Sequence, residues 1–176
     1  MNKINFTPFP LLETERLTLR QLSLEDANEI FRLRSDKSVN KFLDRPIAKT
    51  IDDANQFINK INDSIAKNEL IYWVITLKNH PKLIGTICLW NISEDRSKAE
   101  IGFELLLEYH GKGIMQEVIL KVIKYGFEEM HLRSIDGDVD PSNLKSIKLL
   151  EKNGFIFHKR LPNTLIYSLQ NLNNSD

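Results

Sequence analysis

The sequence predicts one mixed α/β domain, with an antiparallel sheet in its first part and a β–α–β unit after it. Three observations lead to this class. Segments with the alternating pattern of strands gather in the middle of the chain, and segments with helical periodicity lie on both sides of them. No internal repeat or long linker divides the 176 residues, a length that suffices for one substantial core.

Composition narrows the functional classes. The 24 basic and 24 acidic residues give a formal net charge of zero, which argues against a surface built for nucleic acid. The single cysteine, Cys88, cannot form an intrachain disulfide and favours an intracellular setting. The first residues lack the apolar run of a signal peptide, and no later segment is long and apolar enough to span a bilayer. We therefore expect a cytoplasmic protein with no nucleic-acid partner and no membrane partner.

The first third of the chain predicts one strand and two helices. Residues 16–22, "RLTLRQL", alternate like a strand. Ser23 is a suitable N-cap for a helix over 24–34. Thr50 begins a second helix, roughly Ile51 to Lys67, whose isoleucines form one apolar stripe.

The middle of the chain is rich in predicted strands. Residues 70–78, "LIYWVITLK", and 82–92, "KLIGTICLWNI", are joined by "NHP" and predict a hairpin. Residues 98–107, "KAEIGFELLL", predict a third strand beside them.

The last third predicts the β–α–β unit and a closing hairpin. Asp140 and Pro141 fit the N-cap and first turn of a helix that runs to Asn153. Gly154 is placed to end that helix in a left-handed conformation. The other predicted elements are a helix after Gly113 and strands over 134–139, 155–160 and 164–170.

Two glycines, Gly111 and Gly113, stand immediately before one of the best helical segments. A Walker A loop would need a glycine at Leu106, and a dinucleotide fingerprint would need one at Gln116, so both motifs fail. A strand that leads through glycines into a helix still presents free N–H groups at a positive dipole end, where Lys112 adds charge. The segment is therefore either a plain turn or a phosphate site.

The wider context favours the phosphate site. "AEIGFELLLEYHGKGIMQEVI", followed by "DPSNLKSIKLLEKNGF", resembles the GCN5-related N-acetyltransferases (GNAT), and among them the ribosomal-protein-alanine N-acetyltransferases. The opening "LETERLTLRQLSLEDA" and the order of elements extend this resemblance over residues 10–171, which we take as one N-acetyltransferase domain. The resemblance implies a GNAT-like mixed sheet, with flanking helices, whose fourth and fifth strands splay apart.

The resemblance also implies acetyl-CoA as the co-substrate and no metal. The pantetheine arm of acetyl-CoA would bond main-chain groups between the splayed strands, and the pyrophosphate of acetyl-CoA would lie on amides of the glycine segment. The cofactor-binding residues implied in this way are Phe103, Leu105, Leu107, His110, Gly111, Lys112, Gly113, Ile114, Met115 and Asn143. One departure is Glu108, where the family has Gln or Arg. An acidic side chain there costs affinity unless it points away from the phosphates.

Amide transfer from a thioester needs a neutral amine, and an alkyl ammonium has a pKa near ~10, so a base is useful. Some family members place a catalytic glutamate where this chain has Glu100. Strand alternation puts Glu100, Gly102 and Glu104 on one face, opposite Ile101, Phe103 and Leu105. Two acids on one face would raise each other's pKa, which suits a base. The alternative is a solvated polar face with no catalytic role.

The proton donor for the leaving thiolate is less clearly marked. Many relatives use a tyrosine at the position of Leu150. Ser146 matches a serine that takes this role in the ribosomal-protein group, or it is a mid-helix serine bonded to the main chain. Asn143 matches a cofactor-contacting asparagine, or it only caps the helix.

The sequence thus predicts an acetyl-CoA-dependent N-acetyltransferase that acts on a primary amine. The ribosomal-protein resemblance favours a protein N-terminal amine as the acceptor. A small amine (a polyamine, an amino acid or an aminoglycoside) is the first alternative, and a non-catalytic acyl-CoA-binding module is the second. For the oligomeric state, we expect an isologous homodimer.

Overall fold

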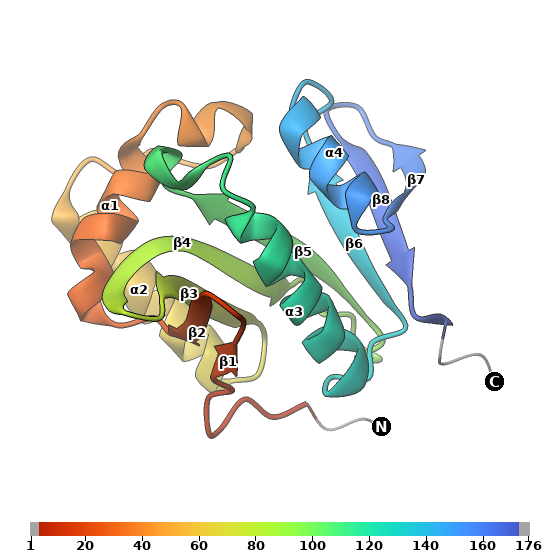
Figure 1. Ribbon diagram of the computed structural model, residues 1–176, viewed down its shortest axis with the longest axis horizontal. Coiled ribbons are helices and arrows are strands. Elements are labelled where there is room, and N and C mark those ends of the chain that lie inside the picture. Colours follow the sequence, from red (N-terminus) through yellow and green to blue (C-terminus); the bar gives the residue numbers. More distant parts are fainter. Residues whose placement is uncertain (1–3, 173–176) are drawn as a thin grey trace.

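The structure is a computed structural model that describes residues 4–172. These residues form an eight-stranded sheet in the order β1-β2-β3-β4-β5-β6-β8-β7, with helices on both faces (Figure 1). The strands are β1 (Leu12–Glu13), β2 (Leu17–Gln21), β3 (Ile71–Leu77), β4 (His80–Trp90), β5 (Lys98–Leu105), β6 (Ser134–Val139), β7 (Ile156–Arg160) and β8 (Leu165–Gln170). The helices are α1 (Ala27–Ser35), α2 (Ile51–Ala66), α3 (Ile114–Glu128) and α4 (Leu144–Lys152), with 3-10 turns η1 (Leu24–Asp26), η2 (Val39–Phe42) and η3 (Leu107–Tyr109).

The predicted fold class is confirmed, with the short strand β1 as an addition. Neighbouring strands are antiparallel except β5 and β6, which are parallel because α3 connects them. The hairpin between β3 and β4 is tighter than predicted, since β4 already begins at His80.

Both N-terminal helical segments begin with the capping residues that the sequence predicts. Ser23 and Asp26 form a capping box, although the first turn after it is the 3-10 turn η1 and α1 proper begins at Ala27. Thr50 and Asp53 form a second capping box at the start of α2. These caps satisfy backbone N–H groups that would otherwise lack partners at each helix start.

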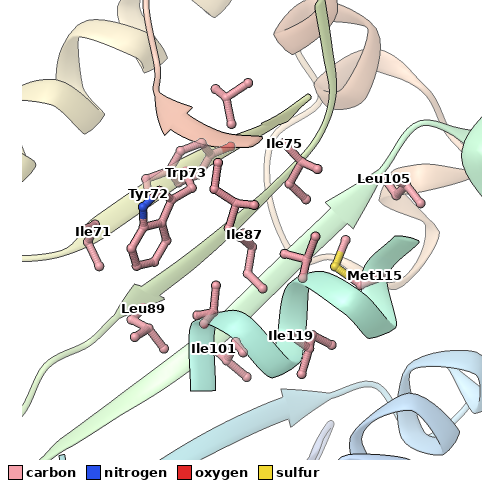
Figure 2. Packing of buried hydrophobic residues seen from close by; sticks show 14 of the residues in the cluster. Ile71, Tyr72, Trp73, Ile75, Ile87, Leu89, Ile101, Leu105, Met115 and Ile119 are labelled. Carbon is pink, nitrogen blue, oxygen red and sulfur yellow. The ribbon is translucent and has the colours of Figure 1, made fainter. Parts of the chain in front are cut away.

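The two faces of the sheet carry different helices. On one face, Trp73 packs edge-on against Tyr125 of α3, with ring centroids 5.2 Å apart. Figure 2 shows Trp73, Ile87, Leu89 and Ile101 of the strands with Ile119 of α3. On the other face, Tyr72 packs edge-on against Phe57 of α2 at 5.9 Å. Residues of β4 and β5 that alternate with this core therefore face α1 and α2.

The start of α4 differs from the prediction. Its N-cap is Asn143, and the helix begins at Leu144 instead of Pro141. Asp140 forms a separate turn, because its carboxylate accepts from the Ser142 N–H at 2.7 Å. The predicted end is confirmed, since Gly154 has φ +85° in the left-handed region.

The parallel strands β5 and β6 diverge, as the resemblance implies for the fourth and fifth strands. Their pairing ends at Glu100 and Asp136. Beyond this point β5 continues to Leu105, while β6 continues to Val139 beside β8 instead (Figure 1). The last five residues of β5 therefore have a strand partner only on the β4 side.

Candidate functional site

The divergence leaves main-chain groups of β5 without a strand partner. The Leu106 N–H donates to the Ile84 carbonyl at 2.9 Å, which sets the hydrogen-bonding alternation between β5 and β4. In an antiparallel pair the intervening residues direct their N–H and C=O groups the other way. Phe103 and Leu105 are intervening residues, so their main-chain groups face the gap left by β6.

The glycine segment lies between β5 and α3 and adopts a backbone that favours glycine. Gly111 has φ +73° and Gly113 has φ +71°, both in the left-handed region. A β-carbon added at Gly111 would meet no described atom within 4 Å, and one added at Gly113 would meet only Arg16, at 3.6 Å. The space beside both glycines is therefore open.

The amides that follow these glycines are free of internal partners. Gly113 is the N-cap of α3 and provides no side-chain cap, and among the described residues no hydrogen bond is donated by the amides of Gly111 to Met115. The side chains of Ile114 and Met115 are buried in the core, so these two residues anchor the turn. Figure 2 shows Met115 in this core. The result is a set of unsatisfied donors at the positive end of a helix dipole.

Leu107 and His110 occupy a different place from the one predicted. Leu107 does not extend β5 but begins η3, and its carbonyl accepts from the His110 N–H at 3.1 Å. This amide is therefore not free for a phosphate. The His110 ring nitrogen Nε2 lies 2.9 Å from the Leu105 carbonyl oxygen, to which it donates as the Nε2–H tautomer.

Glu108 is directed to an arginine of α1. Its carboxylate accepts from Arg32 Nη2 at 2.7 Å, and this hydrogen bond lowers the pKa of Glu108. The acidic departure from the family pattern is thus neutralised by a partner within the chain. Lys112 lies on the exposed side of the glycine segment, with Nζ 5.3 Å from the centroid of the Tyr109 ring.

Arg16 is a residue beside the glycine segment that the sequence did not single out. Its guanidinium donates to the Lys112 carbonyl at 3.0 Å and to the Glu117 carboxylate at 2.7 Å. Glu117 also accepts from the Thr14 hydroxyl at 2.5 Å. The segment before β2 is thereby tied to the first turn of α3. Sequence spacing gave no signal, because about one hundred residues separate the partners.

Glu100 is the last residue of β5 that pairs with β6, and it is partly buried. Burial raises the pKa of its carboxyl, the hydrogen bond from Asn91 at 2.7 Å opposes this rise, and the nearby Asp138 and Asp136 add to it. A raised pKa suits a general base. Asp136 is its register partner on β6, so its side chain lies on the same face of the sheet.

Glu104 does not perturb Glu100 in the predicted way. It shares the face of Glu100, but Arg45 bonds both of its carboxylate oxygens, at 2.6 and 3.3 Å. The acids that raise the pKa of Glu100 are Asp138 and Asp136 instead. The prediction of a Glu100–Glu104 pair is therefore wrong, because the sequence gave no sign that Arg45 lies between α1 and β5.

Ser146 and Asn143 both lie at the start of α4. Asn143 accepts the Ser146 N–H at 3.2 Å, so its role as a helix cap is confirmed and its amide NH₂ can still donate. Ser146 is in the first turn and not in mid-helix, and its hydroxyl makes no hydrogen bond among the described residues. Leu150 of α4 lies against Gly137, on the face of β6 opposite Asp136, so α4 and the Glu100 side chain lie on opposite faces of the sheet.

Within residues 4–172, no group of histidine, cysteine, aspartate and glutamate side chains could hold a metal ion. None of the helices in this part of the chain combines the length and apolar character needed to cross a membrane.

The chain is similar to known acetyltransferases in sequence and structure. The uncharacterized N-acetyltransferase p20 of Bacillus licheniformis is 36% identical over 144 residues, which are 82% of this chain and 81% of that protein. The ribosomal-protein-S5-alanine acetyltransferase of Vibrio fischeri superposes with a TM-score of 0.79 at 25% identity, over 95% of this chain and all of the other. The spermidine N-acetyltransferase of Vibrio cholerae, solved with CoA and spermine, shares the fold with a TM-score of 0.79 at 23% identity, over 88% and 95%.

A family model decides the assignment. The model of the acetyltransferase (GNAT) domain matches residues 16–156, which include the divergent strands, the glycine segment and α4. This chain therefore belongs to the GNAT acetyltransferase family.

Proposed function

We propose that this protein binds acetyl-CoA where β5 and β6 diverge and transfers the acetyl group to the N-terminal amine of a peptide or protein. The observation that carries the proposal is the loss of pairing after Glu100 and Asp136. It leaves a run of main-chain donors and acceptors that an extended, amide-containing ligand can satisfy as an additional strand would.

The remaining cofactor contacts follow from the glycine segment. The free amides of Gly111, Lys112, Gly113, Ile114 and Met115 would hold the pyrophosphate, since the space beside both glycines is open. Phe103 and Leu105 would bond the pantetheine amides, and the Asn143 NH₂ is placed to donate at the start of α4. The His110 amide already donates to the Leu107 carbonyl, so it would not bond the pyrophosphate. When bound, acetyl-CoA supplies an activated acyl group.

Two side chains of this protein would handle the protons of the reaction. Glu100 would take the proton of the attacking amine, directly or through a water, because its raised pKa makes the carboxylate a stronger base than an ordinary glutamate. The Ser146 hydroxyl, which has no partner among the described residues, would donate a hydrogen bond to the departing sulfur. A thiol has a pKa of about 8.5, so the leaving group needs little further help.

The choice of a peptide amine rests on the likeness to the ribosomal-protein-S5-alanine acetyltransferase. A small amine is the second candidate, because Asp136 and Asp138 lie near Glu100 and would attract any cation. The fold alone does not decide between them, since it also serves a spermidine N-acetyltransferase.

The experiment is an acceptor panel under acetyl-CoA. Peptide N-termini, spermidine, amino acids and an aminoglycoside would be offered, with release of the CoA thiol and mass gain of the acceptor as paired readouts. We expect thiol release with one class of amine, and a gain of one acetyl group on that amine. Binding of acetyl-CoA without turnover on any amine would mean a non-catalytic module.

A further inference from the structure

Arg34, in the last turn of α1, differs from the other arginines near the site. Four arginines each bond a carboxylate at 2.6 to 2.7 Å, namely Arg16, Arg20, Arg32 and Arg45. Arg34 is partly buried, and no carboxylate or hydrogen-bond acceptor among residues 4–172 pairs with its guanidinium. Its Cζ lies 3.9 Å from the centroid of the Phe57 ring, which holds the group against α2.

The surroundings of Arg34 contain more donors than acceptors. Glu104 attracts Arg34 through space, but both of its oxygens are bonded by Arg45, whose charge repels Arg34. The hydroxyl of Tyr72, which packs against Phe57, is also buried and lacks a hydrogen bond of normal geometry, although Thr86 is close enough to interact with it. Only Arg45 bonds this carboxylate, so neither the Arg34 guanidinium nor the Tyr72 hydroxyl pairs with it. A half-buried cation in this state is costly unless a ligand supplies an acceptor.

Arg34, Arg45 and the Tyr72 hydroxyl lie on the same face of the sheet as Glu100, where the proposed base would meet the amine substrate. Glu104, Gly102 and Glu100 alternate along β5 on the face that α1 and α2 cover. At about 3.3 Å per residue, Glu104 is about 13 Å along the strand from Glu100. The face is thus negative near Glu100, Asp136 and Asp138, and positive near Arg34.

We propose that Arg34 binds a carboxylate of the acceptor, so that the acceptor carries an acidic group as well as the reacting amine. The inference rests on the proposed function and names its substrate class. A free α-amino acid is too short to reach from Glu100 to the neighbourhood of Glu104. An extended peptide advances about 3.3 to 3.6 Å per residue, so an acidic side chain two or three residues after the N-terminal amine spans this distance. A planar guanidinium is suited to such a carboxylate because it donates two parallel hydrogen bonds.

The test uses matched acceptors and three variants. Ala-Ala-Glu-Ala amide and Ala-Ala-Gln-Ala amide differ only in the charge of the third residue, while free glutamate and spermidine represent the other sources of an amine. We expect the wild-type protein to prefer the Glu peptide by about 10- to 100-fold in kcat/KM, the range of a charge-assisted hydrogen bond. Arg34→Gln should remove this preference and leave the Gln peptide's rate nearly unchanged. Arg34→Lys should retain part of it.

Lys37→Gln is the control for lost charge, since Lys37 is exposed just after α1 and should keep the full preference. An equal rate for both peptides, a preference that survives Arg34→Gln, or a clear preference for spermidine or free glutamate would overturn the proposal. If the wild-type protein acetylates no amine, the proposed function fails by itself. Calorimetry of the Glu and Gln peptides with CoA present then decides the role of Arg34, because tighter binding of the Glu peptide that Arg34→Gln abolishes would still support it, and equal binding would end it.

Discussion

The Arg45 guanidinium bonds both oxygens of Glu104, at 2.6 and 3.3 Å, with side chains that are only 20% and 10% exposed. This pair fixes the segment after α1 on the sheet and leaves Glu100 as the acid of β5 without a cationic partner among the described residues. The two glutamates therefore have different environments on one strand. Glu104 is held in a structural ion pair with Arg45, whereas Glu100 lies beside Asp136 and Asp138 with a raised pKa.

The first prediction concerns the glycine segment. Asparagine tolerates the left-handed backbone better than other residues, so Gly111→Asn should fold while its side chain enters the open space beside the loop. We expect acetyl-CoA to bind at least ~10-fold more weakly, a loss of ~1.4 kcal/mol, and to raise the Tm less than in the wild type. Gly154→Asn is the matched control, because Gly154 is also left-handed but ends α4 away from the amides. If acetyl-CoA raised the Tm equally in both variants and the wild type, the pyrophosphate would not bind at this loop.

The second prediction concerns the contact between the N-terminal segment and α3. Glu117→Ala deletes the acceptor for Thr14 and Arg16, and should cost about 2 kcal/mol of unfolding free energy. Glu128→Ala, on the exposed side of the same helix, should change it by no more than about 0.5 kcal/mol. Chemical denaturation of each variant gives these values.

Low pH should reduce the unfolding free energy that Glu117 contributes. Burial tends to raise the pKa of this carboxyl, but hydrogen bonds from Thr14 and Arg16 outweigh it, so the pKa is lowered in the folded state. The unfolded chain therefore takes up the proton first as the pH falls. The stability that Glu117 contributes is present above the unfolded pKa of about 4.3, and it is lost as the pH falls through the lower folded pKa. A difference between wild type and Glu117→Ala that stayed constant from pH 7 to pH 3 would contradict this account.

The sequence predicted the elements well where local chemistry defines them. Thr50 and the left-handed Gly154 are short-range signals that marked the start of α2 and the end of α4 correctly, and Ser23 marked the 3-10 turn η1 that leads into α1. The start of α4 was placed three residues too early, because Asp140 and Asn143 are both good caps. Which of the two caps the helix depends on the path of the chain after β6, and tertiary contacts determine that path.

The site was predicted less completely because its electrostatics depend on distant partners. Pairs such as Arg45 with Glu104 and Arg32 with Glu108 join residues 59 and 76 positions apart. No periodicity connects such residues, so the sequence placed an unpaired acid where the structure has an ion pair. The backbone of the glycine segment was easier to predict, since Gly111 and Gly113 mark the left-handed turn directly.

The third prediction concerns Ser146. Its hydroxyl has no hydrogen bond among the described residues, so Ser146→Ala should change the unfolding free energy by no more than about 0.5 kcal/mol. Acetyl-CoA affinity should stay nearly the same, while turnover falls by roughly 10-fold or less, because the thiolate leaves readily. Asn143→Ala provides the contrast, since it loses a helix cap worth about 1 kcal/mol and the donor that we propose for the cofactor. Much weaker acetyl-CoA binding by Ser146→Ala would make the serine a binding residue.

The last prediction tests the base. Glu100→Gln keeps the size of the side chain and can still accept the Asn91 hydrogen bond, but it cannot take a proton. Turnover should fall by roughly 10²-fold near neutral pH and recover in part at higher pH, where more of the amine is already neutral.

The free energy of unfolding of Glu100→Gln should not fall together with its turnover. Because the folded pKa of Glu100 is raised, its ionisation opposes folding above that pKa, so Glu100→Gln should be at least as stable as the wild type at pH 7. Glu104→Gln is the structural control, since it disrupts the pair with Arg45 and should lower stability with little change in turnover per folded molecule. The measurement is turnover against pH for all three proteins, normalised to the fraction that binds acetyl-CoA. Curves of equal height and shape for wild type and Glu100→Gln would end the assignment of Glu100 as the base.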